Sequence, residues 1–151
     1  MGEYGRIKGK KSLQLVEVTM KFYKDFLMDH YKNPRNRGEI EHPDFETAQY
    51  NPSCGDSISI QGSIKNGVLT SLAFVGKGCV ISQAVASVLT EFCIGKTIDE
   101  VLLLERGDLS KIIGMDLGPI RIKCALLSLV ALKDGILEYK KRLDKKGARP
   151  I

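Results

Sequence analysis

The sequence lacks several features that would place it in a class at once. It has no apolar run near the roughly 20 residues that span a bilayer, and Met1–Lys11 is basic without the apolar core of a secretory signal. Histidine occurs only 2 times, without the His-Glu arrangement that a metal-dependent hydrolase needs. Neither basic end interleaves its charges with the stacking aromatics of a nucleic-acid binder. These absences favour a soluble, cytoplasmic protein that binds neither membrane nor nucleic acid.

The remaining composition is typical of one globular domain. The chain has 151 residues and a mass of 16.7 kDa, with 43% hydrophobic and 27% charged residues. Its net charge of +5 comes largely from Arg6–Lys11 and Lys140–Arg149, which favours solubility and leaves an acidic protein partner open. We expect a flexible basic arm over residues 1–18 and a single domain over residues 19–151.

Changes of periodicity predict a two-layer α+β fold, in which a small antiparallel three-stranded sheet packs against several helices. Asn66-Gly67 between two alternating segments is a hairpin signal. Asn33-Pro34 ends the first helix. The predicted strands cover residues 45–50, 58–64 and 68–74, and the predicted helices cover residues 19–31, 81–92, 97–104, a short segment capped by Asp108 and ending near Gly114, and 119–145 with a break allowed near Gly135.

The stretch Asn51–Asp56 organises the interpretation of function. It places the thiol of Cys54 and the carboxylate of Asp56 two residues apart in a tight turn. Pro52 restricts one φ angle and Gly55 frees another, so that both side chains can bend toward one point. A thiolate and a carboxylate that converge repel each other unless a cation lies between them. The stretch therefore predicts a site for a metal ion or a small metal–sulfur cluster.

Two further cysteines are candidates for the same site. Cys79 precedes a clear helix, whose free N–H groups favour a thiolate, and Gly76 and Gly78 leave room beside it for a bulky group. Cys124 follows Arg121 and Lys123, whose charges also favour a thiolate. Both cysteines are also compatible with a purely structural, buried role.

The other cysteine and the histidines are not candidate ligands. Cys93 lies inside a helix among apolar neighbours and is interpreted as structural. His30 is expected to pack on the first helix and His42 to lie in a loop. Three cysteines and Asp56 make the four ligands of a closed tetrahedral site, but their spacing matches no zinc finger.

Several motifs carry a resemblance to a known family. They are DHYKNPRNRG (Asp29–Gly38), NPSCGD (Asn51–Asp56), GKGCVISQAVAS (Gly76–Ser87), GKT (Gly95–Thr97) and RIKCALL (Arg121–Leu127). Through them the chain, from Tyr23 almost to its C-terminus, resembles the iron–sulfur cluster assembly scaffold family of the NifU N-terminal, IscU and SufU type. The resemblance implies a small α+β fold with a site near solvent. It also implies that Cys54, Cys79 and Cys124 are the family's cysteines and that Asp56 is the aspartate that tunes cluster release.

The residues before the third cysteine divide this family into branches. IscU-type members have a histidine directly before it and a Leu-Pro-Pro-Val-Lys chaperone motif earlier, whereas this chain has Lys123 and the stretch Leu117–Arg121. Lys123 and Arg121 are similar to the SufU type, whose members hold zinc on three cysteines and the aspartate. SufU proteins also carry an insertion, for which there is no room between Gly95 and Arg121. Both a transient 2Fe-2S cluster and Zn²⁺ therefore stay open as occupants.

The resemblance implies a route of sulfur transfer. Cys124 would accept persulfide sulfur from a cysteine desulfurase, supported by Arg121 and Lys123. A 2Fe-2S cluster would then form on the three cysteines, with Asp56 near the fourth position, and pass to apo acceptor proteins. Such a protein is a carrier rather than an enzyme, apart from a sulfurtransferase activity. The alternatives are a zinc-dependent sulfur acceptor that activates the desulfurase and a structural zinc module, and the oligomeric state (monomer, dimer or trimer) stays open.

Overall fold

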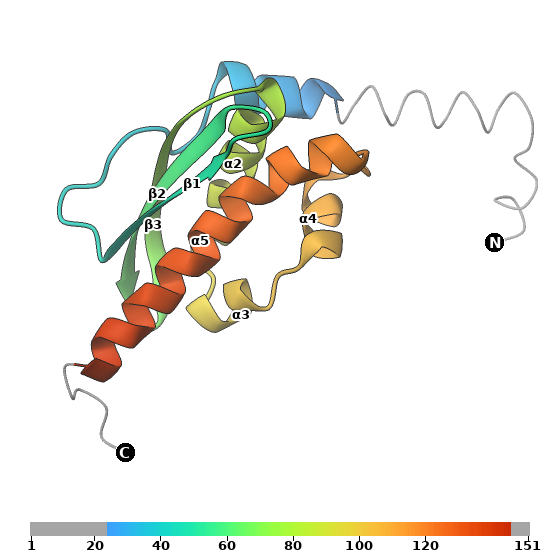
Figure 1. Cartoon of the computed structure of the whole chain (residues 1–151). Coiled ribbons are helices and arrows are strands. Elements are labelled where there is room, and N and C mark those ends of the chain that lie inside the picture. The colour runs from blue at the N-terminus through green and yellow to red at the C-terminus, as the bar shows by residue number, and fades with distance from the viewer. Residues whose placement is uncertain (1–23, 146–151) are drawn as a thin grey trace, which may run out of the picture.

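A computed structural model of the protein describes residues 24–145 (Figure 1). A helix of residues 24–32 comes first, and its predicted beginning at residue 19, like the predicted arm over residues 1–18, lies outside the described residues. The elements that follow are β1 (Phe45–Asn51), β2 (Asp56–Lys65), β3 (Val68–Lys77), α2 (Val80–Cys93), α3 (Ile98–Leu102), α4 (Arg106–Ile113) and α5 (Pro119–Lys145).

The three strands form one antiparallel sheet in the order β1-β2-β3, as predicted. Asn66 and Gly67 both have positive φ angles, 53° and 77°, as a two-residue hairpin turn requires. One face of β2 is buried through Ile58 and Ile60, whereas the opposite face of the sheet exposes Tyr50. The sheet therefore has one core face and one outer face.

Helices cover the core face of the sheet. α5 packs on β1 and β2, α2 packs on β3, and the two helices contact each other (Figure 1). The result is the predicted α+β arrangement of a sheet against several helices. Among the helices of residues 24–145, none has both the length and the apolar character that crossing a membrane requires.

Phe45 explains why α5 runs without the break that we allowed near Gly135. A methyl group added at Gly135 would lie 2.3 Å from the ring of Phe45, and one added at Gly62 of β2 would lie equally close. The ring therefore sits between two glycines, one on a helix and one on a strand. Gly135 makes room for this contact, and the helix continues through it to Lys145.

Two helix boundaries differ from the prediction. Asp108 does not precede α4, as its assignment as a cap implied. It is the third residue of the helix and accepts a hydrogen bond from the N–H of Glu105, so Glu105 is the N-cap of a reciprocal capping box. Thr97 does cap α3, as predicted, with Glu100 as its reciprocal partner, but this helix ends at Leu102 rather than Leu104.

Candidate metal centre

The turn between β1 and β2 presents the first two candidate ligands. The carbonyl of Asn51 accepts hydrogen bonds from the N–H groups of Cys54 and Gly55, at 3.3 and 2.8 Å, and Gly55 has a φ of +72°. This turn leaves Cys54 exposed. Asp56 begins β2 and is fully buried. The thiol of Cys54 lies 3.2 Å from Oδ2 of Asp56.

The start of α2 brings Cys79 to the same carboxylate. Cys79 is the N-cap of α2, and its sulfur accepts a hydrogen bond from the N–H of Ser82 at 3.5 Å. Its own N–H donates to Oδ1 of Asp56 at 2.8 Å, while its sulfur lies 3.3 Å from Oδ2. The backbone of Cys79 thus occupies one oxygen of Asp56 and leaves the other oxygen facing the thiols.

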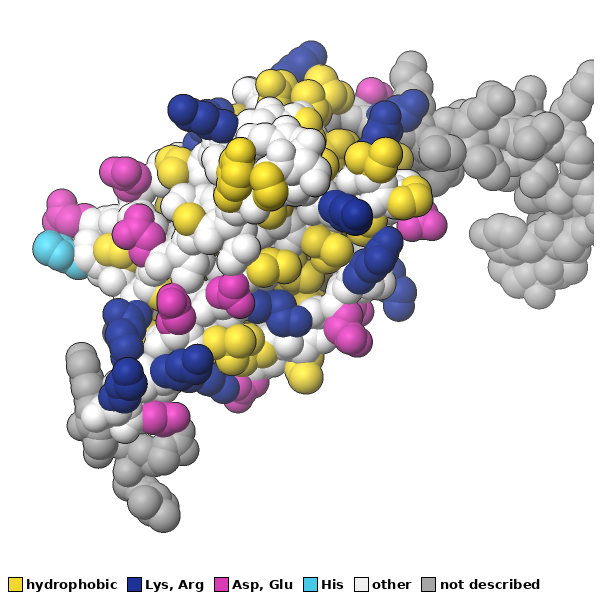
Figure 2. All heavy atoms as spheres, viewed as in Figure 1, with side chains coloured by type: hydrophobic (Ala, Val, Ile, Leu, Met, Phe, Trp, Pro, Cys, Tyr) yellow, Lys and Arg dark blue, Asp and Glu magenta, His cyan; other side chains and the backbone are white. Residues whose placement is uncertain are grey.

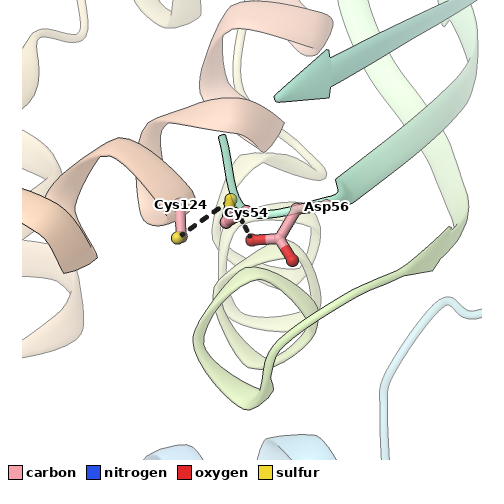
Figure 3. Close-up of side chains that lie close together, drawn as sticks. All are labelled: Cys54, Asp56 and Cys124. Carbon is pink, nitrogen blue, oxygen red and sulfur yellow. Dashed lines mark hydrogen bonds between the residues drawn. The ribbon is translucent and has the colours of Figure 1, made fainter. Parts of the chain in front are cut away.

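Cys124 approaches from the first turns of α5. Its sulfur lies 3.6 Å from the sulfur of Cys54 and 3.8 Å from the carbonyl oxygen of Ile120. Figure 3 shows Cys54 between Cys124 and Asp56, with the two contacts drawn as dashed lines. The site is therefore assembled from the β1–β2 turn, the start of α2 and the start of α5, which lie far apart in the sequence.

These distances suit ligands that share one metal. Around a tetrahedral Zn²⁺ two sulfur ligands lie about 3.8 Å apart, and a sulfur and an oxygen about 3.5 Å apart. The corresponding separations here are 3.6 Å between two sulfurs and 3.2 and 3.3 Å between sulfur and oxygen. Cys54, Asp56 and Cys124 offer ligand atoms that all lie within 4.8 Å of one another, and Cys79 is not part of this group, although its sulfur lies 3.3 Å from Oδ2 of Asp56. Soft thiolates with one carboxylate suit zinc or iron–sulfur centres.

The same neighbours set the protonation of the site. Burial of the Asp56 carboxyl raises its pKa, but the N–H of Cys79 and the neighbouring thiols lower it, so that the net pKa lies below the usual value. The pKa of Cys124 is raised, first by burial and then by its hydrogen bonds with Asp56 and Cys54. An ionised carboxylate beside the protonated thiol of Cys124 is an arrangement in which a bound cation would make that thiol an anionic ligand as well.

Arg121 and Lys123 are both exposed at the start of α5. Burial, followed by the hydrogen bonds with Asp56 and Cys54, raises the pKa of Cys124, which opposes the effect that we expected from these two cations. Their support of sulfur transfer stays a prediction.

The residues interpreted as structural lie away from this centre. Cys93 is fully buried, and burial raises its pKa to about 12. His30 is also buried, with Nδ1 2.7 Å from the hydroxyl of Ser87. His42 is exposed in the loop before β1. Neither histidine belongs to the cluster of candidate ligands that the described residues form.

Gly78 is a residue of the site whose role the sequence did not reveal. Its φ is +137°, and a methyl group added to it would lie 1.9 Å from Oδ1 of Asp56. We expected Gly76 and Gly78 to make room for a bulky ligand. The structure places the protein's own Asp56 carboxylate against Gly78, and the carbonyl of Ser57 lies 2.5 Å from a methyl group added at Gly76.

The chain is similar to known proteins over most of its length. Residues 22–146 match the family described as NifU-like N terminal domain. The chain is 34% identical over 131 residues to the zinc-dependent sulfurtransferase SufU of Bacillus subtilis (strain 168), covering 76% of this chain and 88% of the relative. It is 30% identical over 128 residues to the iron–sulfur cluster assembly scaffold protein IscU of Escherichia coli (strain K12), covering 82% and 98%.

A solved structure shows the same fold. The N-terminal part of a nitrogen-fixing NifU-like protein from Brucella abortus superimposes with a TM-score of 0.64 at 22% identity, covering 78% of this chain and 93% of that one. At this identity the likeness concerns the fold alone. The sequence matches, which extend over most of the chain, show the kinship: the chain belongs to the NifU-like N-terminal domain family.

Proposed function

We propose that this protein is an iron–sulfur cluster assembly scaffold, which receives sulfur, builds a transient 2Fe-2S cluster and passes it to acceptor proteins. The observation that carries the proposal is the convergence of three thiols on one ionised carboxylate. Oδ2 of Asp56 lies 3.2 Å from the sulfur of Cys54 and 3.3 Å from that of Cys79, and the sulfur of Cys124 lies 3.6 Å from that of Cys54. The IscU relatives support this choice by name.

The exposure of the ligands suits a cargo that must leave. Cys54 and Cys79 are exposed, while Asp56 is buried beneath them. A competing thiol of an acceptor can therefore approach the cluster from solvent. The carboxylate is a harder ligand than a thiolate and is displaced more easily from iron. Asp56 would thus hold the cargo without retaining it as tightly as a fourth cysteine.

Cys124 is the proposed sulfur acceptor. As a thiolate it attacks the terminal sulfur of a desulfurase persulfide; the donor's S–S bond breaks, a new S–S bond forms on Cys124, and the desulfurase leaves as a thiolate. This exchange needs no external oxidant or reductant. Because the pKa of Cys124 is raised by its burial, the exposed Arg121 and Lys123 would act once the desulfurase encloses the centre and excludes water.

A second candidate function is a zinc-dependent sulfur acceptor that activates a desulfurase. The similarity to the sulfurtransferase SufU of Bacillus subtilis favours it, together with Lys123 before the third cysteine. Bound zinc would keep the thiols ionised and ordered. Cys54, Asp56, Cys79 and Cys124 would hold it, and Cys124 would take up sulfur when the desulfurase competes for a ligand. Both candidate functions need cysteines that are not joined in disulfides, which suits the reducing cytoplasm.

The experiment that separates the two functions measures metal content and visible absorption. The purified chain is incubated under argon with iron, cysteine and a cysteine desulfurase. A scaffold gains sulfide-to-iron charge-transfer bands that transfer to an apo acceptor. One retained zinc per chain, a colourless protein and a stimulated desulfurase indicate the sulfur acceptor instead.

Asp56→Ala is expected to lengthen the lifetime of the reconstituted cluster. The substitution removes the ligand that a competing thiol displaces most easily, and we expect the loss of absorption to slow about tenfold, which corresponds to about 1.4 kcal/mol. The decay of the charge-transfer bands in the presence of a chelator measures it. Asp116→Ala, at an exposed position outside the site, is the matched control. A cluster lost from Asp56→Ala as fast as from the parent contradicts the role of Asp56 in release.

A further inference from the structure

The sulfurs of Cys54 and Cys124 are in direct contact. They lie 3.6 Å apart, close to the van der Waals distance of two sulfur atoms. Cys54 is exposed in the turn between β1 and β2, and Cys124 is buried near the start of α5. A disulfide bond is about 2.05 Å long, so the two sulfurs need to approach by about 1.5 Å to form one. Rotation of the exposed Cys54 side chain can supply this movement.

Asp56 holds the sulfur of Cys54 at this contact. Its Oδ2 accepts a hydrogen bond from the thiol of Cys54 at 3.2 Å, and the N–H of Cys79 donates to its other oxygen at 2.8 Å. Figure 3 shows the result, in which Cys54 lies between Asp56 and Cys124. Because Asp56 is fully buried at the start of β2, its carboxylate is a fixed support for the exposed thiol. Cys54 is thereby positioned against any group that Cys124 carries.

The other two thiols are less suited to react with a group on Cys124. The sulfur of Cys79 accepts a hydrogen bond from the N–H of Ser82 at 3.5 Å and faces Oδ2 of Asp56 at 3.3 Å. An attack by Cys79 would therefore give up the N-cap of α2. Cys93 is fully buried at the end of α2 and lies outside the cluster of candidate ligands. Cys54 is therefore the thiol best placed for such a reaction.

We infer that Cys54 is the resolving cysteine of sulfur transfer, the thiol that removes the persulfide from Cys124; this inference rests on the proposed uptake of sulfur by Cys124. The sulfur of Cys54 attacks the inner sulfur of the persulfide, which is that of Cys124 itself. The S–S bond of the persulfide breaks and an S–S bond between Cys54 and Cys124 forms. The terminal sulfur leaves as hydrosulfide and takes up the proton of the Cys54 thiol. Two electrons pass from the sulfur of Cys54 to the departing sulfur.

This step supplies sulfur in the oxidation state that a cluster contains. The bridging atoms of a 2Fe-2S cluster are sulfide, whereas the sulfur of a persulfide is more oxidised. The reaction with Cys54 reduces that sulfur to sulfide within the proposed site. Cys54 then has a chemical role in the transfer, in addition to its proposed role as a ligand.

The disulfide must be reduced before Cys54 and Cys124 can bind metal. A thiolate of an external dithiol attacks the exposed sulfur of Cys54 rather than that of Cys124, which is 6% exposed. The second thiol of the reductant then closes the reductant's own disulfide, and both cysteines return to thiols. On the face of the molecule shown in Figure 2, acidic and basic side chains are interspersed, so no field of one sign is expected to favour a charged reductant there. An uncharged dithiol therefore suits the test.

The test follows sulfur and thiols through one turnover without a reductant. The full chain, freed of metal with a chelator, is mixed under argon with an equimolar amount of persulfide-loaded cysteine desulfurase that has been separated from free cysteine. We expect release of one sulfide per chain, together with a disulfide between Cys54 and Cys124 in peptide mapping. After reduction with an uncharged dithiol and removal of that dithiol, a second portion of loaded desulfurase should release the same amount.

Cys54→Ser is expected to separate uptake from release. The serine hydroxyl can donate to Asp56 as the thiol does, but it cannot form a disulfide. The persulfide should therefore remain on Cys124, so that the intact chain is heavier by one sulfur atom, and sulfide release should fall to the level of the desulfurase alone. Cys93→Ala, which removes a fully buried cysteine outside the site, is the matched control and should release sulfide as the parent does.

Three results overturn the inference. One is a parent chain that keeps the persulfide on Cys124 while the thiol of Cys54 stays free. The second is sulfide release by Cys54→Ser at the rate of the parent. The third is a disulfide between Cys79 and Cys124 in the parent, which would assign the step to Cys79. All three leave the uptake of sulfur by Cys124 intact, whereas a parent and a Cys54→Ser chain that both take up no sulfur contradict the proposed function, and the inference with it.

Discussion

Replacing Gly78 with alanine is expected to weaken metal binding strongly. A methyl group there would lie 1.9 Å from Oδ1 of Asp56, on a backbone with a φ of +137°. The backbone strain costs about 1–3 kcal/mol, and displacement of the carboxylate costs about 1–3 kcal/mol more, because the hydrogen bond from the N–H of Cys79 is weakened. We expect zinc affinity to fall about 100-fold or more, since each factor of ten corresponds to about 1.4 kcal/mol. Competition against a chromophoric zinc chelator measures it.

The control for this substitution is Gly107→Ala in α4. Nothing lies within 4 Å of a methyl group at that position, and its φ requires no glycine. The helix propensity of alanine should raise stability by up to about 1 kcal/mol, without any change in zinc affinity. The thermal midpoint of Gly78→Ala should fall by about 10 °C. An unchanged zinc affinity in Gly78→Ala would mean that Asp56 is not a ligand.

Replacing Cys124 with serine is expected to abolish sulfur uptake. A serine hydroxyl is not ionised at neutral pH and does not attack a persulfide. It is small enough for the same space and can donate to the carbonyl of Ile120, as the thiol does, so the fold should be preserved. We expect transfer from a radiolabelled desulfurase persulfide to drop to the level measured without the protein. Mass spectrometry should find no sulfur adduct on the variant.

Cys93→Ala serves as the control for Cys124→Ser. Cys93 is fully buried, and its pKa of about 12 keeps its thiol protonated at neutral pH. Its removal should cost about 1 kcal/mol of stability and leave sulfur uptake intact. Persulfide formation on Cys54 or Cys79 in Cys124→Ser, at the rate of the parent, would move the acceptor role to that cysteine.

The sheet and most helices could be predicted from the sequence because their signals are local. Asn66-Gly67 needs only its own backbone angles to form the hairpin turn, and Thr97 and Glu100 contact each other within one turn of α3. The N-cap of α4 was misassigned because Glu105 and Asp108 cap each other, and the pattern alone does not show which of the two lies outside the helix.

Features that depend on contacts between distant parts of the chain could not be predicted from local sequence patterns. In the sequence, Gly135 suggests a break in a helix because glycine disfavours helices. The structure shows that a glycine is needed there to leave space for the ring of Phe45. Gly78 was expected to accommodate a ligand, whereas the carboxylate of Asp56, at the start of β2, fills the space. The convergence of three cysteines and Asp56 was inferred through a family resemblance, because the chemistry of each residue is visible in the sequence but their separations in space are not.

The sulfur of Cys79 makes two contacts. It accepts a hydrogen bond from the N–H of Ser82, which caps α2, and it also faces an oxygen of Asp56. An acceptor that draws this sulfur away from its cargo thereby uncaps the helix, at a cost of about 0.5–2 kcal/mol. Transfer of the cluster to an acceptor would then be coupled to fraying of the first turn of α2. Because α2 contacts both β3 and α5, the loaded and emptied forms would differ in local unfolding, and amide hydrogen exchange at Ser82 would report which form is present.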